Sequence, residues 1–151
     1  MLRTVVLVSG LLCLGSNAAA QVNTGDLKWG PAPEVFPAGA QMAVLSGDPT
    51  KSGVFVIRLK MPAGYKIPAH NHPTDEYVTV VSGDLSLGMG DKLDPAKSAK
   101  LSPGGFAVAG AKMNHFAFST GGAVVQVSAE GPFALTYVNP ADDPSKRPTG
   151  K

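Results

Sequence analysis

Two histidines and a glutamate lie close together in a pattern that suits metal binding. His70 and His72 are two residues apart, and Glu76 follows four residues after His72. Side chains of a β-strand point alternately to opposite faces, so these three share one face while Asp75 points away, provided that the turn at 73–74 keeps the alternation. Two imidazoles and a carboxylate on one face form most of a coordination sphere for a divalent transition metal. The alternative is two chance histidines on a half-exposed strand.

The stretch from Gly64 to Gly83 resembles the first motif of the cupin superfamily. Its two end glycines, its two histidines and its glutamate match the spacing G-x5-H-x-H-x3-E-x6-G. For a chain of this composition, such a match is expected by chance roughly once in 10⁵ sequences. The resemblance covers about residues 40–130, and it implies an all-β domain with the cupin-type β-barrel or jelly-roll architecture.

The third and last histidine, His115, lies where the second cupin motif is expected. That motif has the approximate spacing G-x5-P-x-G-x2-H-x3-N. Residues 103–105 (Pro-Gly-Gly) resemble its P-x-G element, but His115 follows ten residues later, and Ser119 replaces the asparagine. Alternatively, Gly110 ends that element and His115 follows five residues after it. The second motif is therefore degenerate, and His115 is either a third imidazole ligand or a core histidine bonded to a backbone carbonyl.

Carried over to this chain, the resemblance implies one metal centre with three histidines and one glutamate. The implied ligands are His70, His72, Glu76 and His115. Such a set leaves up to two positions of an octahedron open and suits Mn, Fe, Ni, Co or Zn without choosing among them. Catalysis and ligand capture both need open positions, whereas a structural site is normally closed.

Other residues near the implied ligands are candidates for the surrounding pocket. Strand parity would let the pocket be lined by Val78, Val80, Met113 and Ala117, although ordinary core packing is the simpler role for each. Three residues close in sequence to the ligands could meet a substrate: Tyr65, Lys66 and Asn114. Gln126 interrupts an apolar run, so it either supports a ligand or faces outward.

The first twenty residues have the features of a secretory signal peptide. Arg3 supplies a positive charge, residues 4–15 are apolar, and residues 18–20 (Ala-Ala-Ala) offer an A-x-A cleavage site. The apolar run is shorter than the ~20 residues that a spanning helix needs, which argues against an uncleaved anchor. We therefore predict cleavage after Ala20, a periplasmic or secreted protein, and no membrane association of the mature chain.

Composition narrows the chemistry further. Cleavage would remove Cys13, the only cysteine, and with it any disulfide or thiolate ligand. The net charge is only +2 in 151 residues, and the basic residues are scattered. This pattern argues against a nucleic-acid or membrane-surface footprint.

The rest of the chain reads as one β-rich domain flanked by irregular segments. We predict a signal peptide at 1–20, an extended arm at 21–39, a cupin domain at 40–138 and a flexible polar tail at 139–151. Trp29 and Phe36 are the expected anchors of the arm, on the same subunit or on a neighbour, and family analogy suggests a homodimer. Turn signals separate about nine predicted strands: 41–45, 54–60, 76–81, 85–87, 100–102, 106–108, 115–118, 124–128 and 133–138. Residues 88–99 are predicted to form a loop.

Three functions fit this sequence. The first is an exported enzyme that uses the metal to activate dioxygen or to polarise a small oxygenated substrate, as many cupins do. The second is a periplasmic protein that holds a small ligand or a metal without turnover. The third is a degenerate cupin with a structural role, because the second motif departs from the family pattern.

Overall fold

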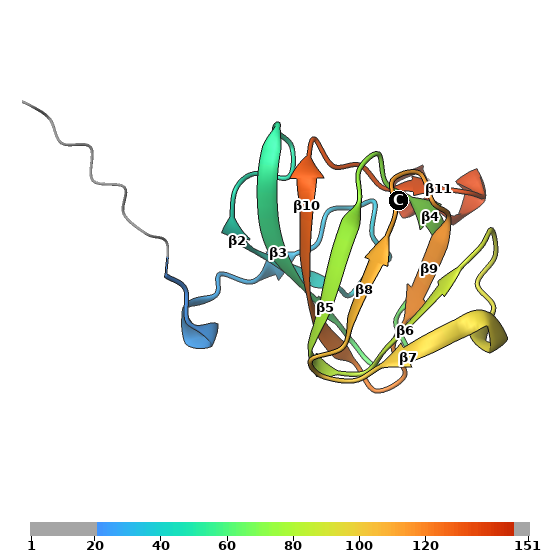
Figure 1. The fold of residues 1–151 in the computed structure, drawn as a ribbon, viewed down its shortest axis with the longest axis horizontal. Helices are drawn as coiled ribbons and strands as arrows, with labels where there is room; N and C mark the ends of the chain where they lie inside the picture. Colours follow the sequence, from blue (N-terminus) through green and yellow to red (C-terminus); the bar gives the residue numbers. More distant parts are fainter. Residues whose placement is uncertain (1–20, 147–151) are drawn as a thin grey trace, which may run out of the picture.

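The computed structural model describes residues 21–146, which fold into two antiparallel sheets packed face to face (Figure 1). The six-stranded sheet has the order β1-β2-β3-β10-β5-β8, and the five-stranded sheet has the order β11-β4-β9-β6-β7. The strands are β1 (Gly30–Pro31), β2 (Gln41–Ser46), β3 (Gly53–Met61), β4 (Lys66–Asn71), β5 (Glu76–Gly83), β6 (Leu85–Met89), β7 (Ser98–Leu101), β8 (Phe106–Ala109), β9 (His115–Phe118), β10 (Ala123–Gly131) and β11 (Thr136–Tyr137). This arrangement confirms the predicted all-β jelly roll.

Helical structure within residues 21–146 consists of short 3-10 turns. They are η1 (Thr24–Asp26), η2 (Pro95–Lys97), η3 (Pro140–Asp142) and η4 (Pro144–Lys146). No helix among the described residues is long and apolar enough to cross a membrane. The predicted signal peptide at 1–20 and the end of the tail at 147–151 lie outside the described residues.

The core lies between the two sheets and is filled by alternate residues of their strands. β10 pairs with β3 over its whole length and with β5 on its other side. Along β3, Phe55, Ile57 and Leu59 are buried, and their neighbours face outward. This period of two is the expected pattern of a strand with one face on a core. The largest wholly buried side chains include Phe55 at 0 % exposure, and each such burial contributes about 1.5–3 kcal/mol.

The two glycines at the ends of the 64–83 stretch have backbone reasons for being glycine. Gly64 has φ +74° and Gly83 has φ +77°, which is the left-handed region that L side chains rarely adopt. A Cβ on Gly83 would also lie 2.0 Å from the carbonyl oxygen of Gly122, where β5 and β10 approach each other. Both glycines therefore set the turns that begin and end the ligand-bearing segment.

The five-stranded sheet contains an irregularity that the sequence pattern does not reveal. The register between β4 and β9 shifts between Ile67 and His70, next to Pro68. A proline lacks the N–H that a strand ladder needs, so it is tolerated at a bulge. As a result Ile67 and His70, three residues apart, both face the interior.

The later part of the arm and the first part of the tail pack against the domain. Pro31 lies in the edge strand β1, where a missing N–H is tolerated, and Phe36 packs against the core of the same chain. Trp29 is half-buried, with Lys60 Nζ 6.0 Å from its ring centroid. Within the predicted tail, η3 and η4 follow Asn139, and Asp143 is buried between them.

Several predicted boundaries need correction. The predicted strand at 133–138 is reduced to β11 (Thr136–Tyr137). The predicted loop at 88–99 is shorter than expected, since β6 continues to Met89 and β7 already begins at Ser98. His115–Phe118 forms a strand with the predicted bounds.

Candidate metal centre

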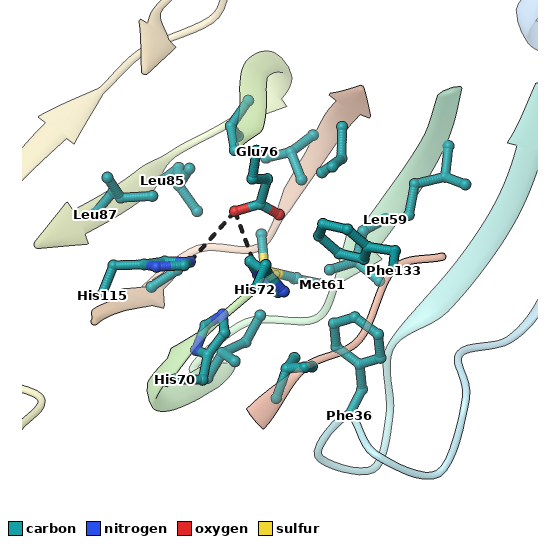
Figure 2. Close-up of a pocket in the computed structure, with 17 residues that line it drawn as sticks. Phe36, Leu59, Met61, His70, His72, Glu76, Leu85, Leu87, His115 and Phe133 are labelled. Atoms are coloured by element: carbon teal, nitrogen blue, oxygen red, sulfur yellow. Dashed lines mark ion pairs between the residues drawn. The ribbon is translucent and has the colours of Figure 1, made fainter. Parts of the chain in front are cut away.

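The four side chains predicted as ligands meet in the interior, between the two sheets (Figure 2). His70 lies near the end of β4 and His72 follows that strand, while Glu76 opens β5. His115 opens β9, and its Cα is paired directly with that of His70 in the β4–β9 ladder. The predicted parity also holds for Asp75, which points away and accepts a hydrogen bond from the N–H of Ala111 (2.7 Å). The structure thus brings the predicted residues together, while their role as ligands stays a prediction.

The three imidazoles form a tight cluster. One nitrogen from each of His70, His72 and His115 can be chosen so that all three lie within 4.8 Å of one another, which is a grouping that could hold a metal ion. The ring centroids are 4.3 Å apart for His70 and His115 and 4.9 Å apart for His70 and His72. Glu76 Oε2 lies 3.3 Å from His115 Nε2 and 3.6 Å from His72 Nε2. All four side chains are almost wholly removed from solvent, Glu76 being 12 % exposed.

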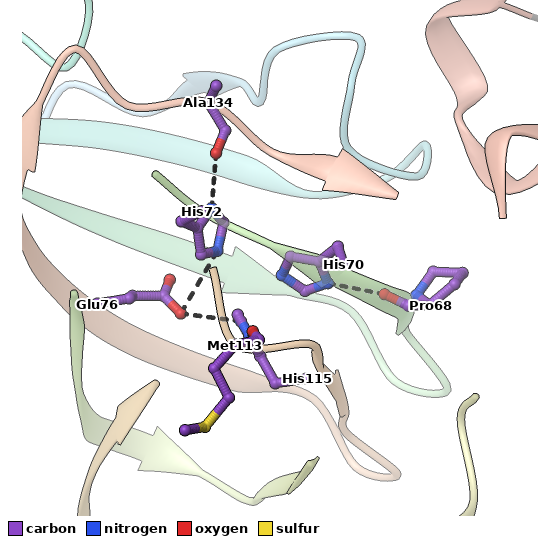
Figure 3. Close-up of polar contacts among 7 residues, drawn as sticks. All are labelled: Pro68, His70, His72, Glu76, Met113, His115 and Ala134. Atoms are coloured by element: carbon purple, nitrogen blue, oxygen red, sulfur yellow. Dashed lines mark hydrogen bonds and ion pairs between the residues drawn. The ribbon is translucent and has the colours of Figure 1, made fainter. Parts of the chain in front are cut away.

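The Nδ1 atom of each imidazole contacts a backbone carbonyl oxygen (Figure 3). His70 Nδ1 lies 2.7 Å from the carbonyl oxygen of Pro68, and His115 Nδ1 lies 2.9 Å from that of Met113. His72 Nδ1 lies 2.8 Å from the carbonyl oxygen of Ala134. A carbonyl oxygen only accepts, so each Nδ1 must be the N–H donor, and each neutral ring keeps a lone pair on Nε2.

The Nε2 atoms of His72 and His115 are buried, and among the described residues they have no hydrogen-bond partner of good geometry, although the Glu76 carboxylate lies 3.6 and 3.3 Å away. A buried polar atom without a partner normally costs about 1–3 kcal/mol, so native structures rarely contain one without a reason. Metal-ligating histidines typically donate their other ring N–H to a carbonyl or carboxylate, which is the arrangement of all three rings here. The donor set therefore fits a divalent transition metal.

The pKa is lowered for His70 and His72 but raised for His115. Burial lowers the pKa of His70 to about 3, assisted by the neighbouring His115 and His72, and burial also lowers the pKa of His72. Burial alone would lower the pKa of His115, but its contact with the Glu76 carboxylate outweighs burial and raises it. Burial alone would raise the pKa of Glu76, yet the contact with His115 and the charge of His72 hold it below its ordinary value.

The loop before His115 explains how this histidine reaches the cluster although the second motif is degenerate. The N–H of Lys112 donates to the carbonyl oxygen of His72 (2.7 Å), and Lys112 has φ +60°, which is uncommon for a residue other than glycine. Asn114 accepts a hydrogen bond from the Asn71 side chain (2.8 Å) and donates one to Asp91 (2.7 Å). These contacts tie the loop to the end of β4, so the altered spacing is absorbed before β9 begins.

A cavity of about 40 Å³ adjoins the cluster. Seventeen of the described residues line it, and only the three histidines and Glu76 among them carry polar side chains. The other lining residues come from both sheets, from the arm and from residues 133–135. The cavity is therefore polar at the cluster and apolar elsewhere.

Some of the remaining candidate residues line the cavity and others do not. Val78 and Ala117 line the cavity as predicted, whereas Val80 is buried in the core and Met113 is 48 % exposed. Gln126 faces outward and accepts a hydrogen bond from Arg58 Nε (3.3 Å), so its predicted alternative role beside a ligand is wrong. The residues suggested for substrate contact, Tyr65, Lys66 and Asn114, are not among those that line the cavity.

Sequence reasoning missed Phe133, which stacks on His72 with a centroid distance of 4.2 Å and an interplanar angle of 21°. The predicted strand at 133–138 includes it, whereas it lies in the irregular segment between β10 and β11. Its only sequence signal is its place directly after Gly131-Pro132, and in the structure it lines the cavity together with Leu135.

Comparison with known proteins agrees with this fold. The polyketide cyclase RemF from Streptomyces resistomycificus has a similar structure, with TM-score 0.68 and 18 % identity over 85 % of this chain and 93 % of that one. A candidate acetylacetone dioxygenase from Methylibium petroleiphilum PM1 gives TM-score 0.62 and 20 % identity over 95 % of this chain and 90 % of that one. An RmlC-like cupin from Shewanella frigidimarina NCIMB 400 gives TM-score 0.57 and 14 % identity over 72 % of this chain and 87 % of that one.

Sequence comparison assigns the family. No curated protein matches the chain. A family model described as a domain of unknown function (DUF4437) matches residues 15–136. The chain therefore belongs to the DUF4437 family, and its fold is of the cupin type.

Proposed function

We propose that this chain is an exported metalloenzyme in which His70, His72, His115 and Glu76 hold one divalent transition metal and a small oxygenated molecule is the substrate. The observation that carries the proposal is the set of three rings fixed through Nδ1, with buried Nε2 atoms that lack a partner on His72 and His115. A bound metal of this class supplies a Lewis acid that polarises a substrate oxygen, or a centre that activates dioxygen.

The protein's own groups have separate roles in this proposal. The three Nε2 atoms bind, and the carbonyls of Pro68, Met113 and Ala134 keep the rings in the required tautomer. Glu76 would add a negative charge to the ligand set, and it is the only carboxylate among the described residues that line the cavity. The apolar walls exclude bulk water, which strengthens electrostatic interactions at the cluster.

The cavity favours an enzyme over a purely structural site, because a structural site is normally closed by its protein ligands. A non-catalytic periplasmic binder of a small ligand or a metal is the second candidate, and the same cavity supports it. The names of two similar structures, a polyketide cyclase and a candidate acetylacetone dioxygenase, are compatible with the enzyme proposal at the level of the fold.

Metal analysis of protein purified from its own compartment tests the metal centre. We expect close to one equivalent of Mn, Fe, Ni, Co or Zn, and a large loss of metal in Glu76→Gln while the β fold persists. Asp75→Asn is the matched control, because that carboxylate faces away from the cluster. Retained metal in Glu76→Gln would remove Glu76 from the ligand set, and absence of metal from the wild type would contradict the proposal.

Oxygen uptake and product analysis then separate enzyme from binder. Turnover that requires the metal supports the enzyme, whereas stoichiometric ligand binding without product supports the binder. Export is tested independently by the mass of the mature chain, which should begin at Gln21 or within a residue or two of it. Retention of residues 1–20 in a membrane fraction would overturn the export proposal.

A further inference from the structure

The polar groups of the cavity are confined to one end. His70, His72, His115 and Glu76 cluster there, and the other lining side chains are aliphatic, methionine or phenylalanine (Figure 2). No Lys, Arg, Ser, Thr, Asn, Gln or Tyr of residues 21–146 is among the lining residues. A second polar group on a bound molecule would therefore be buried without a partner, which disfavours binding by a factor of about ten or more.

The size of the cavity sets a second limit. The space open to the centre of a water-sized molecule is about 40 Å³, so the cavity holds a few small groups and no large molecule. The space next to the cluster therefore suits a short chain, on the order of four non-hydrogen atoms. Size and polarity both disfavour sugars, nucleotides and molecules with several charges.

The arm supplies part of the apolar wall and is held in place at two points. Phe36 lines the cavity, and tyrosine hydroxyls bind the carbonyls on either side of it. Tyr137 donates to the carbonyl oxygen of Val35 (2.8 Å), and Tyr65 donates to that of Pro37. Both tyrosines are buried, and burial raises the pKa of Tyr65, so its hydroxyl keeps the proton that it donates.

These anchors connect the arm to the strand that carries the metal ligands. Tyr137 is paired with His70 in the β11–β4 ladder, and Tyr65 directly precedes β4. Figure 2 shows Phe36 and Phe133 on the side of the cavity away from His115. Phe133 stacks on His72, so of these two phenylalanines Phe36 is the one to change.

We propose that the cavity selects a small molecule with one oxygen-bearing end and a short hydrocarbon body, and that Phe36 sets the permitted length of that body. The proposal rests on the proposed function for the oxygen-bearing end, which the metal would bind. It adds the substrate class and a specificity-determining residue outside the ligand set.

The test uses straight-chain carboxylates from acetate to octanoate, titrated into Co(II)-loaded protein and followed by calorimetry and by the visible spectrum of the metal. Affinity should rise about fourfold per methylene group up to about five carbons and then fall. Pentanoate and 4-hydroxybutyrate have the same number of non-hydrogen atoms, and the hydroxy acid should bind about tenfold more weakly. Equal affinity for this pair, or affinity that does not depend on length, would overturn the proposal.

Phe36→Ala should move the optimum to chains about three carbons longer, because the phenyl ring leaves space. Phe36→Leu should move it by about one carbon and provides the test if the alanine variant does not fold. Phe106→Ala is the matched control, since Phe106 is 57 % exposed on β8 and does not line the cavity. An optimum that stays in place in the Phe36 variants, or that moves equally in Phe106→Ala, would contradict the assignment of Phe36.

Metal content is measured before the titrations, so failure of the proposed function is recognised separately. If the protein binds no metal, a series of alkan-1-ols is tested on the metal-free protein by thermal shift, because an alcohol O–H can donate to the free Nε2 atoms. A length optimum that moves in Phe36→Ala supports the inference even then. Thermal shifts without a length optimum overturn it.

Discussion

The two halves of the cluster are built in different ways. His70, His72 and Glu76 lie within one continuous stretch at the end of β4 and the start of β5. His115 arrives from β9, behind a loop whose spacing departs from the cupin pattern. Yet His115 is paired directly with His70, and it is the ring nearest to Glu76. The comparison teaches that strand pairing places the third histidine, while local spacing places the other two.

The largest effects should come from deleting one ring from each half. His72→Ala and His115→Ala should each lower metal affinity by more than about a hundredfold, since loss of a ligand exceeds the 10–100-fold effects of outer-shell changes. Metal titration of each purified variant, with thermal unfolding as a check of the fold, provides the measurement. If His115→Ala keeps its metal and loses only thermal stability, His115 is a core histidine and the two halves are not equivalent.

Protonation should distinguish the halves in the metal-free protein. His115 should titrate above the ordinary histidine value of 6.5, whereas His70 should stay neutral to about 3. NMR titration of labelled imidazoles measures both. Metal binding requires neutral rings, so affinity should rise as the pH increases through the pKa of His115.

The pKa shifts of His115 and His70 also determine how the stability of the metal-free protein depends on pH. The raised pKa of His115 contributes stability below its unfolded value, and this contribution is lost as pH rises through the folded value. The lowered pKa of His70 has the opposite sign, since its contribution is present above 6.5 and is lost as pH falls towards about 3. If His70 in the metal-free protein became protonated at a higher pH than His115, this assignment would be contradicted.

A smaller effect is expected from the side chains that hold the second half in place. Asn114→Ala removes the hydrogen bonds to Asn71 and Asp91, so it should lower the free energy of unfolding by about 1–2 kcal/mol and metal affinity by about tenfold. Denaturant unfolding and metal titration measure the two effects. Asn71→Ala removes only one of these bonds and should affect both less. Equal losses in the two variants would mean that the bond from Asn114 to Asp91 contributes nothing.

The smallest effect on stability should come from a substitution outside the metal-ligand cluster, at Asp143. Asp143 accepts hydrogen bonds from the N–H and hydroxyl of Ser145, contacts lowering its pKa below the ordinary value. Stability from this carboxylate is present above the unfolded pKa and is lost as pH falls towards the folded one. Asp143→Asn should therefore change thermal stability slightly at neutral pH, converge with the wild type in acid, and leave metal affinity unchanged. A change in metal affinity would show that the tail reaches the centre.

Sequence reasoning was most successful where function and local geometry coincide. The spacing of His70, His72 and Glu76 predicted their shared face, and the short β-rich runs separated by turn signals predicted an all-β barrel or jelly roll. It could not locate the bulge at Pro68, because two strands that are distant in sequence determine that register. It also could not show that Phe133 stacks on His72 or that the side chain of Gln126 faces outward, since both depend on tertiary packing.

The acceptors that orient the three rings are main-chain atoms of Pro68, Met113 and Ala134. A carbonyl oxygen is present whatever side chain a residue carries, so substitutions at these positions leave the acceptors intact as long as the backbone keeps its path. The orientation of the imidazoles is thus robust to mutation, and a comparison of sequences would show no residue type responsible for it. Engineers who wish to retune the centre would have to reshape the backbone or exchange the rings themselves.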